Sequence, residues 1–350
     1  MNSRRVLHVL GTADPAGLGV YRIVESLALR VDPARYEIHV CFLRPGELAE
    51  RLRSQGIQST CIDWCGRVVD PPGLMRYAAL LRSTKFDIIH QHTGGRLITG
   101  MGRQLAGARI VRSLHGRASE TTGVVTPNKL ARYDALIANS QIVAEHARDA
   151  NAVVIYPGID VSQWIVPRPA HEGVVIGVAC RLELIKGVEY LLKALALLAS
   201  KFPEVRLEIA GDGSLRATLE QRSQELGLAD KVRFLGWRND LPEVMAGWDI
   251  VAMPSLDEGF GMAALDGMAA GLPVVATAVG GLRELIEDGI TGRLVHPGKP
   301  DELAQRLREL IEDRGVHEAM GRAGRRRALD HFSIDQMVER TLTVYDELFV

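Results

Sequence analysis

The sequence predicts an α/β fold made of two doubly wound domains, each a parallel sheet covered by helices. Three observations lead to this prediction. Short apolar runs alternate with segments of helical periodicity, the alternation starts again half-way along the chain, and 350 residues are too many for one ordinary core. An apolar content of 47% with 24% charged residues is typical of a water-soluble globular protein.

In the first half, apolar runs predict short strands, and a 3.6-residue periodicity predicts helices between them. The expected strands cover 6–10, 36–43, 86–90, 108–113, 135–139 and 153–156, and the expected helices cover 20–30 and 48–55. Pro157 and Gly158, followed by Pro167 and Pro169, indicate a linker. The first domain is therefore expected to be residues 1–165.

The pattern of strands and helices restarts at Val174. The expected strands cover 174–179, 205–210, 232–235, 250–253, 273–276 and 294–295, and the first expected helices cover 187–200 and 215–226. This second domain is expected to be residues 166–333, and a last helix within 334–350 can return to pack on the first domain. Two such domains facing each other would form a cleft at the carboxyl ends of both sheets, where ligands are expected.

The charge is distributed unevenly between the halves. Residues 1–165 hold 20 Lys and Arg against 14 Asp and Glu, whereas residues 166–350 hold 22 against 29. Either the basic first half meets an anionic acceptor or a membrane surface, or the asymmetry is ordinary scatter of surface charge. No nucleic-acid partner is expected.

Cysteine usage and hydropathy suggest the compartment. Four cysteines are too few for a disulfide framework at this length, and Cys61-x3-Cys65 has no second ligand pair that would indicate zinc. Only Val6 to Leu10 follow the basic N-terminus as an apolar run, and no run reaches the ~18 residues of a spanning helix. We therefore expect a cytoplasmic protein, with peripheral association at the inner membrane face as the alternative.

The segment from Glu258 to Asp266 is the most informative part of the chain. It places two carboxylates eight residues apart across a Gly-rich turn that leads from an apolar strand into a helix. A strand, a loop bearing an acid and a helix N-terminus together are how α/β proteins present groups to a small anionic ligand. Glu258 is expected in the loop, and Asp266 about two turns into the helix and aimed at the same cleft.

Two cations occupy a similar position after an earlier strand. Arg181 and Lys186 follow strand 174–179 and precede a helix, which suits a diphosphate. They could equally be solvated cations in a strand-to-helix loop, but Glu258 in the same half favours a ligand site.

Two other strand ends in this half carry weaker signals. Gly211-Asp212-Gly213 is interpreted as a structural turn. Around Leu235 and Trp237, a strand end could pair with a flat heterocycle through its backbone, although core packing explains Phe234 equally well.

In the first half, Gly17 and Gly19 join the first strand to the first helix. They would let main-chain N–H groups approach a phosphate. The loop is no dinucleotide fingerprint, because Arg22 occupies the position of its last glycine.

Three histidines lie at strand ends of the first half. His115 directly follows a strand and precedes a glycine, which favours a functional role. His90 and His92 could imitate a metal pair, but the sequence offers no third ligand nearby. Contact with an acceptor or a plain structural role is therefore favoured for both.

Taken in order, these motifs resemble the retaining nucleotide-sugar glycosyltransferases of family 4, which have the GT-B fold. The resemblance covers nearly the whole chain. It is strongest over residues 174–295, through R-L-E-L-I-K-G, G-D-G, F-L-G-W, E-G-F-G and G-L-P-V-V-A-T-A-V-G-G. In the first half it rests on A-G-L-G-V, S-L-H-G, A-N-S and Y-P-G-I-D.

The resemblance implies that the C-terminal domain binds the nucleotide diphosphate sugar and the N-terminal domain binds the acceptor. Arg181 and Lys186 match the diphosphate-binding pair, and Gly17 and Gly19 match the loop that approaches the same phosphates. His115 matches the histidine near the reactive end of the sugar.

The remaining site residues come from the family's E-x7-E motif. Glu258 matches its first acid, which contacts the sugar hydroxyls, and the main chain of Phe260, Gly261 and Met262 would approach sugar and phosphate. The second acid is Asp266 where the family usually has Glu, and its expected partner is the donor ribose. A shorter arm is expected to alter the donor geometry without abolishing activity.

The implied reaction is sugar transfer with retention, without a metal, a cofactor or a protein nucleophile. The acceptor stays open among a glycan, a lipid-linked saccharide and a small molecule, as do the donor base, the sugar and the oligomeric state. A nucleotide-sugar epimerase or hydrolase, or a non-catalytic sugar-nucleotide binding protein, is the alternative. A dehydrogenase is disfavoured because the dinucleotide pattern fails.

Overall fold

The computed structural model describes residues 3–13, 18–64, 70–116, 130, 132–147 and 151–350. The chain divides into two compact units. One consists of Met1–Gly158 together with Ile334–Val350, and the other of Ile159–Ser333. The chain thus leaves the first unit after Gly158, a few residues before the expected boundary at 165.

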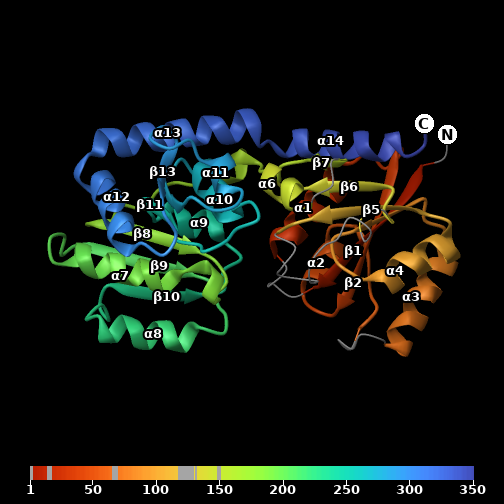
Figure 1. The fold of residues 1–350 in the computed structure, drawn as a ribbon, viewed down its shortest axis with the longest axis horizontal. Coiled ribbons are helices and arrows are strands. Elements are labelled where there is room, and N and C mark those ends of the chain that lie inside the picture. Colours follow the sequence, from red (N-terminus) through yellow and green to blue (C-terminus); the bar gives the residue numbers. More distant parts are fainter. Residues whose placement is uncertain (1–2, 14–17, 65–69, 117–129, 131, 148–150) are drawn as a thin grey trace. The chain divides into compact units, whose positions relative to one another are not determined.

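The first unit contains a parallel sheet with the strand order β3-β2-β1-β4-β5-β6-β7 (Figure 1). Its strands are β1 Arg4–Thr12, β2 Tyr36–Arg44, β3 Gln58–Cys61, β4 Ile88–Gln91, β5 Arg109–Leu114, β6 Ala135–Ala138 and β7 Ala152–Val154. Its helices are α1 Leu18–Arg30, α2 Leu48–Ser54, α3 Pro71–Ser83, α4 Arg96–Met101, the π-helix Gly102–Ala106, α6 Gln141–His146 and α14 Ile334–Glu347.

Alternation along the strands divides this unit into two cores, because successive side chains of a strand point to opposite faces. Val6 and Leu10 of β1 pack with α1, α2 and α14 on one face, and Leu7 and Val9 pack on the other, with residues of α3 and α4. Helix α14 completes the first core from the far end of the chain, through the side chains of Ile334, Met337, Val338, Leu342, Val344 and Tyr345.

The second unit contains a parallel sheet with the strand order β10-β9-β8-β11-β12-β13. Its strands are β8 Val174–Ala179, β9 Val205–Ala210, β10 Val232–Gly236, β11 Ile250–Met253, β12 Val274–Thr277 and β13 Gly292–Val295. Its helices are α7 Val188–Ala199, α8 Arg216–Glu225, α9 Leu241–Ala246, α10 Met262–Ala269, α11 Leu282–Leu285, α12 Pro300–Glu312 and α13 Arg314–His331, with 3₁₀-helices Val161–Trp164 and Leu184–Lys186.

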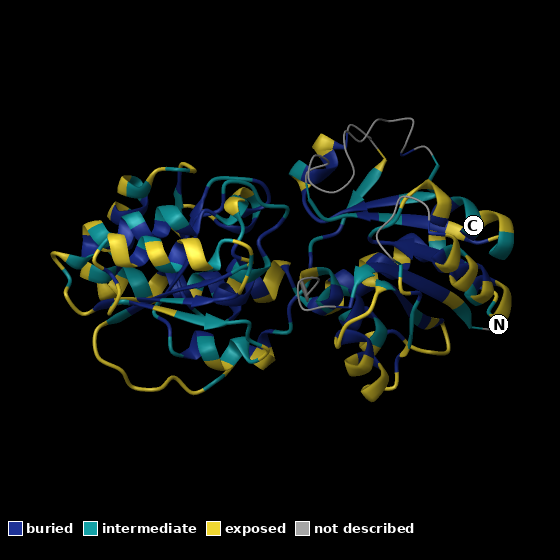
Figure 2. Cartoon of the chain, turned by 90° about the horizontal axis from the view of Figure 1, so that it is seen from below, coloured by how far each residue is buried: buried dark blue, intermediate teal, exposed yellow. Residues whose placement is uncertain are grey.

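Helices cover both faces of this second sheet. Helices α7, α8 and α12 pack on the face that bears Ile176, Val178 and Ile250. On the opposite face, Trp248 lies so close over β8 that a Cβ on Gly177 would fall 1.8 Å from the indole ring. The strands are accordingly buried, while the solvent-facing sides of the helices are exposed (Figure 2). The predicted doubly wound α/β architecture is confirmed.

Both sheets reverse their strand order next to their first strand. In the first unit β1 lies between β2 and β4, and in the second unit β8 lies between β9 and β11. At such a reversal the loops on either side run in opposite directions, and ligands of open α/β sheets bind beyond the carboxyl ends of the strands there. The loops after β8 and β11 are therefore where the second unit is expected to bind a ligand.

Elements of weak local signal escaped the sequence analysis. Strand β3 has a polar sequence that is only half-buried at one edge of the sheet, so it shows neither an apolar run nor a clear alternation. Helix α3 begins with two prolines and is capped by Asp70, whose side chain accepts a hydrogen bond from the N–H of Gly73. Prolines are tolerated in a first helical turn, which needs no N–H donors there.

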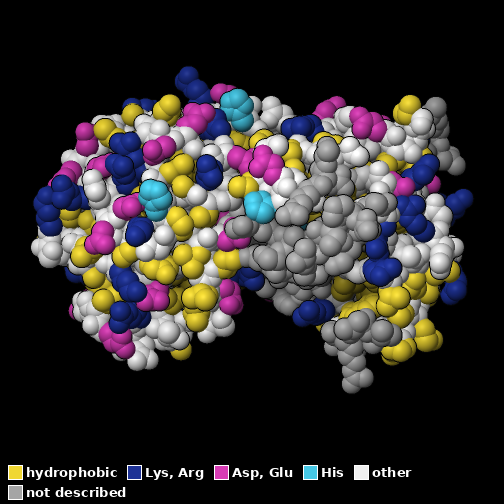
Figure 3. Space-filling view, in the orientation of Figure 1, with side chains coloured by type: hydrophobic (Ala, Val, Ile, Leu, Met, Phe, Trp, Pro, Cys, Tyr) yellow, Lys and Arg dark blue, Asp and Glu magenta, His cyan; other side chains and the backbone are white. Residues whose placement is uncertain are grey.

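The charged side chains and the cysteines lie as follows. On the face of the second unit seen in Figure 3, acidic and basic side chains are interspersed. Cys41, Cys61 and Cys180 are free thiols, and Cys65 lies outside the described residues. Within the described ranges, no helix combines the length and the apolar character needed to cross a bilayer.

Candidate active site

The loops that follow β8 and β11 are held against each other by their backbones. Gly187 begins α7 with a left-handed φ of +64°, and a Cβ at this position would lie 2.1 Å from the carbonyl oxygen of Pro254. The N–H of Leu256 donates to the carbonyl oxygen of Ile185 at 2.8 Å. A side chain at residue 187 would force the two loops apart, so the last glycine of R-L-E-L-I-K-G fixes their distance.

The loop after β12 joins the loops that follow β8 and β11 through a pair of glycines, Gly280 and Gly281. A Cβ on Gly280, whose φ is +49°, would lie 1.6 Å from the carbonyl oxygen of Glu258. The N–H of Gly281 donates to that same oxygen at 3.4 Å. The G-G pair that ends G-L-P-V-V-A-T-A-V-G-G thus holds the backbone of Glu258 in place.

These loops bring together the acid and one of the cations that the sequence singled out. The Nζ atom of Lys186 lies 2.7 Å from Oε2 of Glu258, and the hydroxyl of Ser255 donates to the same oxygen at 3.3 Å. The Lys186 and Glu258 side chains are 16% and 14% exposed. The ion pair is therefore largely screened from water but still reachable from the surface.

Arg181 lies at the start of the same loop and is exposed. The neighbouring Cys180 shows that the three charged groups cluster, because Lys186, Glu258 and Arg181 all act electrostatically on its thiol. Burial of this thiol raises its pKa to about 12, although the residue as a whole is partly exposed. At neutral pH the Cys180 thiol therefore carries its proton, and a protonated thiol is a poor nucleophile.

The segment after Glu258 turns into α10. Gly261 has a φ of +104°, and a Cβ there would lie 2.5 Å from Cδ2 of Leu282. Phe260 is buried with its ring against Phe332, at 5.6 Å between centroids. Met262 is half-buried as the first helical residue, so the positive end of α10 follows directly on the Glu258 loop.

Asp266, the second acid of the motif, differs sharply from the first in its exposure. It lies in the middle of α10 and is only 1% exposed. The structure thus places Glu258 at the accessible edge of the loop and Asp266 in the interior of the helix that follows.

Leu235 and Trp237 lie at the carboxyl end of the edge strand β10, and both are half-buried. Between them Gly236 has a φ of +69° and accepts a 2.7 Å hydrogen bond from the N–H of Gly211. The Nε1–H of Trp237 donates to Oδ1 of Asn239 at 3.3 Å. This strand end therefore joins the G-D-G turn at the same edge of the sheet as the charged loops.

The G-D-G turn is structural, as the sequence suggested. A Cβ on Gly213 would fall within 2.8 Å of three backbone atoms of Leu182, and the N–H of Leu182 donates to the carbonyl oxygen of Asp212 at 2.9 Å. The turn thereby supports the loop that carries Arg181.

The remaining candidates belong to the first unit. His115 directly follows β5, and its Nε2 lies 2.8 Å from Nδ1 of His92. Burial and the nearby Arg112 cation lower the pKa of His115 to about 3, so its imidazole is neutral at pH 7. Gly19 is exposed, and a Cβ added there would meet no atom within 4 Å, whereas Gly17 lies outside the described residues.

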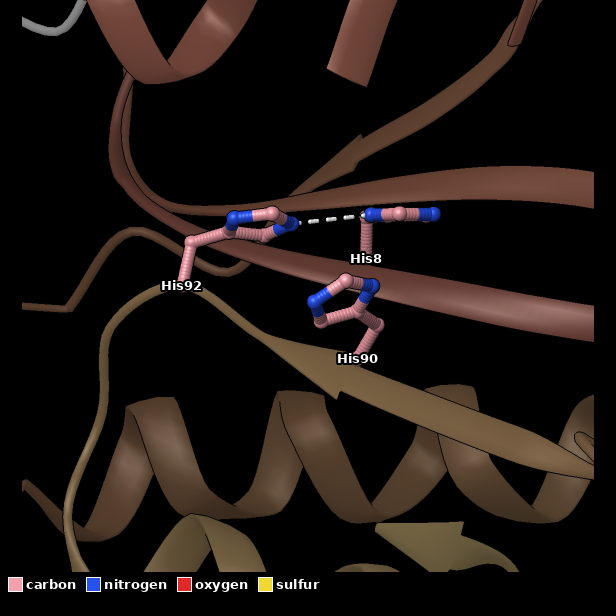
Figure 4. A group of neighbouring side chains, drawn as sticks. All are labelled: His8, His90 and His92. Atoms are coloured by element: carbon pink, nitrogen blue, oxygen red, sulfur yellow. Dashed lines mark hydrogen bonds between the residues drawn. The ribbon is translucent and has the colours of Figure 1, made fainter. Parts of the chain in front are cut away.

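The structure adds a histidine that the sequence analysis missed. His8, His90 and His92 each offer a nitrogen atom, and these atoms lie within 4.8 Å of one another (Figure 4). His8 is the register partner of His90 across β1 and β4. Separation in sequence concealed the contact, although two predicted strands with a histidine near each carboxyl end were a signal for it.

Comparisons with known proteins cover nearly the whole chain. A family profile described as "Glycosyltransferase Family 4" matches residues 18–163, and one described as "Glycosyl transferases group 1" matches residues 165–327. The D-inositol 3-phosphate glycosyltransferase of Mycolicibacterium gilvum is 30% identical over 96% of this chain and 85% of its own length. The chain belongs to glycosyltransferase family 4.

Solved structures agree with this family 4 assignment at the level of the fold. A glycosyltransferase from Rickettsia africae superposes with a TM-score of 0.84 at 20% identity, covering 99% of each chain. Anabaena Alr3699/HepE in complex with UDP superposes with a TM-score of 0.81 at 24% identity, covering 98% of this chain and all of the other. The protein is a glycosyltransferase with the GT-B fold, as the motifs predicted.

Proposed function

We propose that this family 4 enzyme transfers a sugar, with retention of its anomeric configuration, from a nucleotide diphosphate sugar held by the second unit. The observation that carries the proposal is the Lys186–Glu258 ion pair, with Arg181 at the start of the same loop, where the second sheet reverses its strand order. Two cations and one acid at the carboxyl ends of parallel strands suit a diphosphate joined to a polyhydroxylated ring.

Each group has a proposed task. Arg181 can offer a planar fork to two phosphate oxygens, whereas Lys186 offers a compact charge. Both would stabilise the negative charge that develops as the nucleoside diphosphate leaves. Glu258 would accept hydrogen bonds from the sugar hydroxyls, and its bond to Lys186 already fixes the orientation of one carboxylate oxygen.

The main chain and the sheet edge would complete the donor site. The backbone of Phe260, Gly261 and Met262, at the positive end of α10, would approach sugar and phosphate. Leu235 and Trp237 would contact the base. Asp266 keeps its proposed contact with the ribose although its side chain is only 1% exposed in this structure. Fixed positive charge from Arg181, Lys186 and the N-terminus of α10 would take the place that a divalent cation has in other transferases, so no metal or cofactor is part of the proposal.

The acceptor is assigned to the first unit. From the same unit, Gly17 and Gly19 would approach the donor phosphates, and His115 would lie near the reactive end of the sugar. The departing phosphate oxygen would take the proton of the acceptor hydroxyl, which balances the transfer without a protein nucleophile. The acceptor class stays a glycan, a lipid-linked saccharide or a small molecule. A peripheral position at the inner face of a membrane would suit the lipid-linked class.

The names of relatives supply the first compounds to test. Several are D-inositol 3-phosphate glycosyltransferases, at 27–30% identity, and the HepE structures hold UDP and UDP-glucose. UDP-glucose and an inositol phosphate therefore belong in the first panel, beside other nucleotide sugars and lipid-linked acceptors.

A thermal-shift screen of nucleotide sugars tests the proposal directly. A ligand at a hundred times its Kd stabilises the native state by about 2.7 kcal/mol. We expect at least one nucleotide sugar to raise the Tm of the wild type and to lose this effect in Lys186→Met and Arg181→Met. A screen in which no nucleotide or nucleotide sugar shifts the Tm would refute the donor site.

Turnover of the selected donor then separates the enzyme classes. We expect product formation to depend on an acceptor. Rapid release of free sugar from donor alone would support a hydrolase, and conversion to another nucleotide sugar would support an epimerase. Binding with no turnover under any condition would leave a sugar-nucleotide binding protein.

A further inference from the structure

A continuous chain of polar side chains is buried in the first unit, beneath α14. Six side chains take part, from β1, β4, β5 and the segments that follow them and from α14: Ser113, His90, Tyr345, His8, His92 and His115. His8 and His92 are 0% and 8% exposed, and their hydrogen bond is visible in Figure 4. His8, His90 and His92 are buried, and His115 is half-buried. Three buried imidazoles are unusual, because a buried polar group is costly unless it is hydrogen-bonded.

Every ring nitrogen of the three inner histidines has a partner in this chain. Nε2 of His90 lies 2.7 Å from the Ser113 hydroxyl, and Nδ1 of His90 lies 2.6 Å from the Tyr345 hydroxyl. That hydroxyl lies 3.3 Å from Nε2 of His8, whose Nδ1 lies 3.0 Å from Nε2 of His92.

The chain ends at the histidine that the proposed function uses. Nδ1 of His92 lies 2.8 Å from Nε2 of His115. His92 thus holds the Nε2 side of the His115 ring by this hydrogen bond.

All four imidazoles are neutral at physiological pH. Burial lowers the pKa of His8 and of His115 to about 3, and it lowers the pKa of His90 and of His92 well below the ordinary value. The Arg112 cation lowers the pKa further at His90, His92 and His115. A neutral imidazole has one donor and one acceptor, so the direction of one hydrogen bond fixes the next one across each ring. The Tyr345 hydroxyl carries the direction from His90 to His8 when it donates one bond and accepts the other.

The distances around Tyr345 select that direction. A hydroxyl donor makes shorter hydrogen bonds than an N–H donor does. The 2.6 Å bond therefore suits a hydroxyl that donates to Nδ1 of His90, and the 3.3 Å bond suits Nε2–H of His8 donating to the phenol oxygen. His90 then donates from Nε2 to Ser113, and His92 donates from Nε2 to His8.

We propose that this chain is a positioning device that holds His115 as the Nε2–H tautomer, so that its Nδ1 is an acceptor for a substrate hydroxyl. In this direction His115 donates from Nε2 to Nδ1 of His92, which leaves the lone pair on the other nitrogen. The tautomer follows from the hydrogen bonds alone, whereas its catalytic use rests on the proposed function. His8, His90, His92 and Tyr345 act through His115 and are positioning residues.

A bound metal is the competing use of His8, His90 and His92. Neutral imidazoles suit zinc, but a Zn–N distance of about 2.0–2.1 Å with tetrahedral angles separates two ligand nitrogens by roughly 3.3 Å. The facing nitrogens of His8 and His92 are 3.0 Å apart, and the planes of their rings are inclined by 19° to each other. This separation is shorter than two zinc ligands would have and is that of a direct hydrogen bond.

Imidazole nitrogen NMR of the full-length protein tests the proposal. With ¹⁵N-labelled histidine, two-bond couplings from ring protons show which nitrogen carries the proton, and His115→Gln assigns the His115 signals. We expect Nε2–H at His115 in the wild type. Tyr345→Phe should disturb this tautomer and lower kcat by at least about tenfold with little change in KM for the donor, because the wrong tautomer of a catalytic imidazole costs much rate.

Tyr36→Phe is the matched control. The Tyr36 phenol packs edge-on against Tyr345, but its hydroxyl donates to Asp346, which is not one of the six hydrogen-bonded side chains. It should leave both the His115 tautomer and kcat unchanged. Ser113→Ala removes the acceptor at the opposite end of the chain and serves as a second break if Tyr345→Phe does not fold.

Three results would overturn the proposal. One is Nδ1–H at His115 in the wild type, and another is equal behaviour of both tyrosine variants. The third is stoichiometric zinc in the purified protein that is lost in His8→Gln. Failure of the proposed function is recognised separately, since absence of turnover with every nucleotide sugar would leave the NMR result on the tautomer decisive.

Discussion

The Lys186–Glu258 ion pair gives the sharpest test of the site. At 2.7 Å, and with an effective dielectric constant of about 20, two unit charges attract by about 6 kcal/mol. The net stabilisation is much smaller, because both groups lose water when the side chains are only 16% and 14% exposed. Removing one partner leaves the other charge poorly solvated, so Lys186→Met or Glu258→Gln should each destabilise the fold by about 2–3 kcal/mol.

Binding should separate the two variants. Lys186→Met removes a phosphate ligand, so a nucleoside diphosphate should bind at least about tenfold more weakly. Glu258→Gln releases Lys186 from its carboxylate partner, so the same ligand should bind as tightly or more tightly. Both variants should nevertheless lower kcat by about a hundredfold, because each removes an interaction that strengthens in the transition state.

The assays are urea unfolding, calorimetric titration with a nucleoside diphosphate, and initial rates with the donor that the thermal screen selects. Lys193→Met is the matched control. It removes an equal charge from an exposed ion pair with Glu189 on the helix that follows Lys186, so it should change stability by less than about 0.5 kcal/mol and leave turnover unchanged. Near-normal turnover in both site variants would refute the assignment of this pair.

Three further predictions concern the loops, the second acid and the histidines. Gly187→Ala should destabilise the protein by about 3 kcal/mol and impair turnover, because the new Cβ would lie 2.1 Å from the carbonyl oxygen of Pro254. Gly227→Ala is the control, since Gly227 has a φ of +70° and nothing lies within 4 Å of its added Cβ. It should lower the free energy of unfolding in urea by about 1 kcal/mol and leave the activity unchanged. Asp266→Glu keeps the carboxylate but must fit one more methylene at a position that is 1% exposed. We expect kcat to change by less than about tenfold in initial-rate assays. A gain of orders of magnitude would show that the natural enzyme is impaired by Asp266. The free energy of unfolding should fall between pH 6.5 and 5, by up to about 1.4 kcal/mol per pH unit for each buried histidine, because the unfolded chain binds protons there while the pKa values of folded His8 and His115 are about 3. A urea midpoint that stays constant over this range would contradict the buried, neutral state of these imidazoles.

Most of the sheet architecture could be predicted because its signals are local. Strands β8, β9 and β11 match the predicted ranges residue for residue. β8 and β11 are short apolar runs, and β9 alternates apolar residues with Arg206 and Glu208. The buried strands of a parallel sheet need apolar side chains on both faces, which leaves a continuous mark in the sequence. The half-buried edge strand β3 leaves no such mark, and it was missed.

The candidate donor site was predictable only as a set of loops. Motif order placed Arg181, Lys186 and Glu258 after strands of one half. The 2.7 Å contact between Lys186 and Glu258 depends on β8 and β11 being neighbours, although 72 residues separate the two side chains. Gly187 and Gly280 make that contact possible by their lack of a Cβ, which the sequence shows only as two glycines.

The sequence by itself determined the fold class, the family and the residue types available for chemistry, because apolar periodicity and ordered motifs are properties of the chain alone. Only the tertiary structure joined His8 to His90 across two strands. It also brought Tyr345, which is 255 residues from His90 in the sequence, from the last helix to bridge the two histidines. Hydrogen bonds between distant residues are decided by strand register and helix packing. No local pattern records these, so the tautomer that we propose for His115 follows from the folded protein alone.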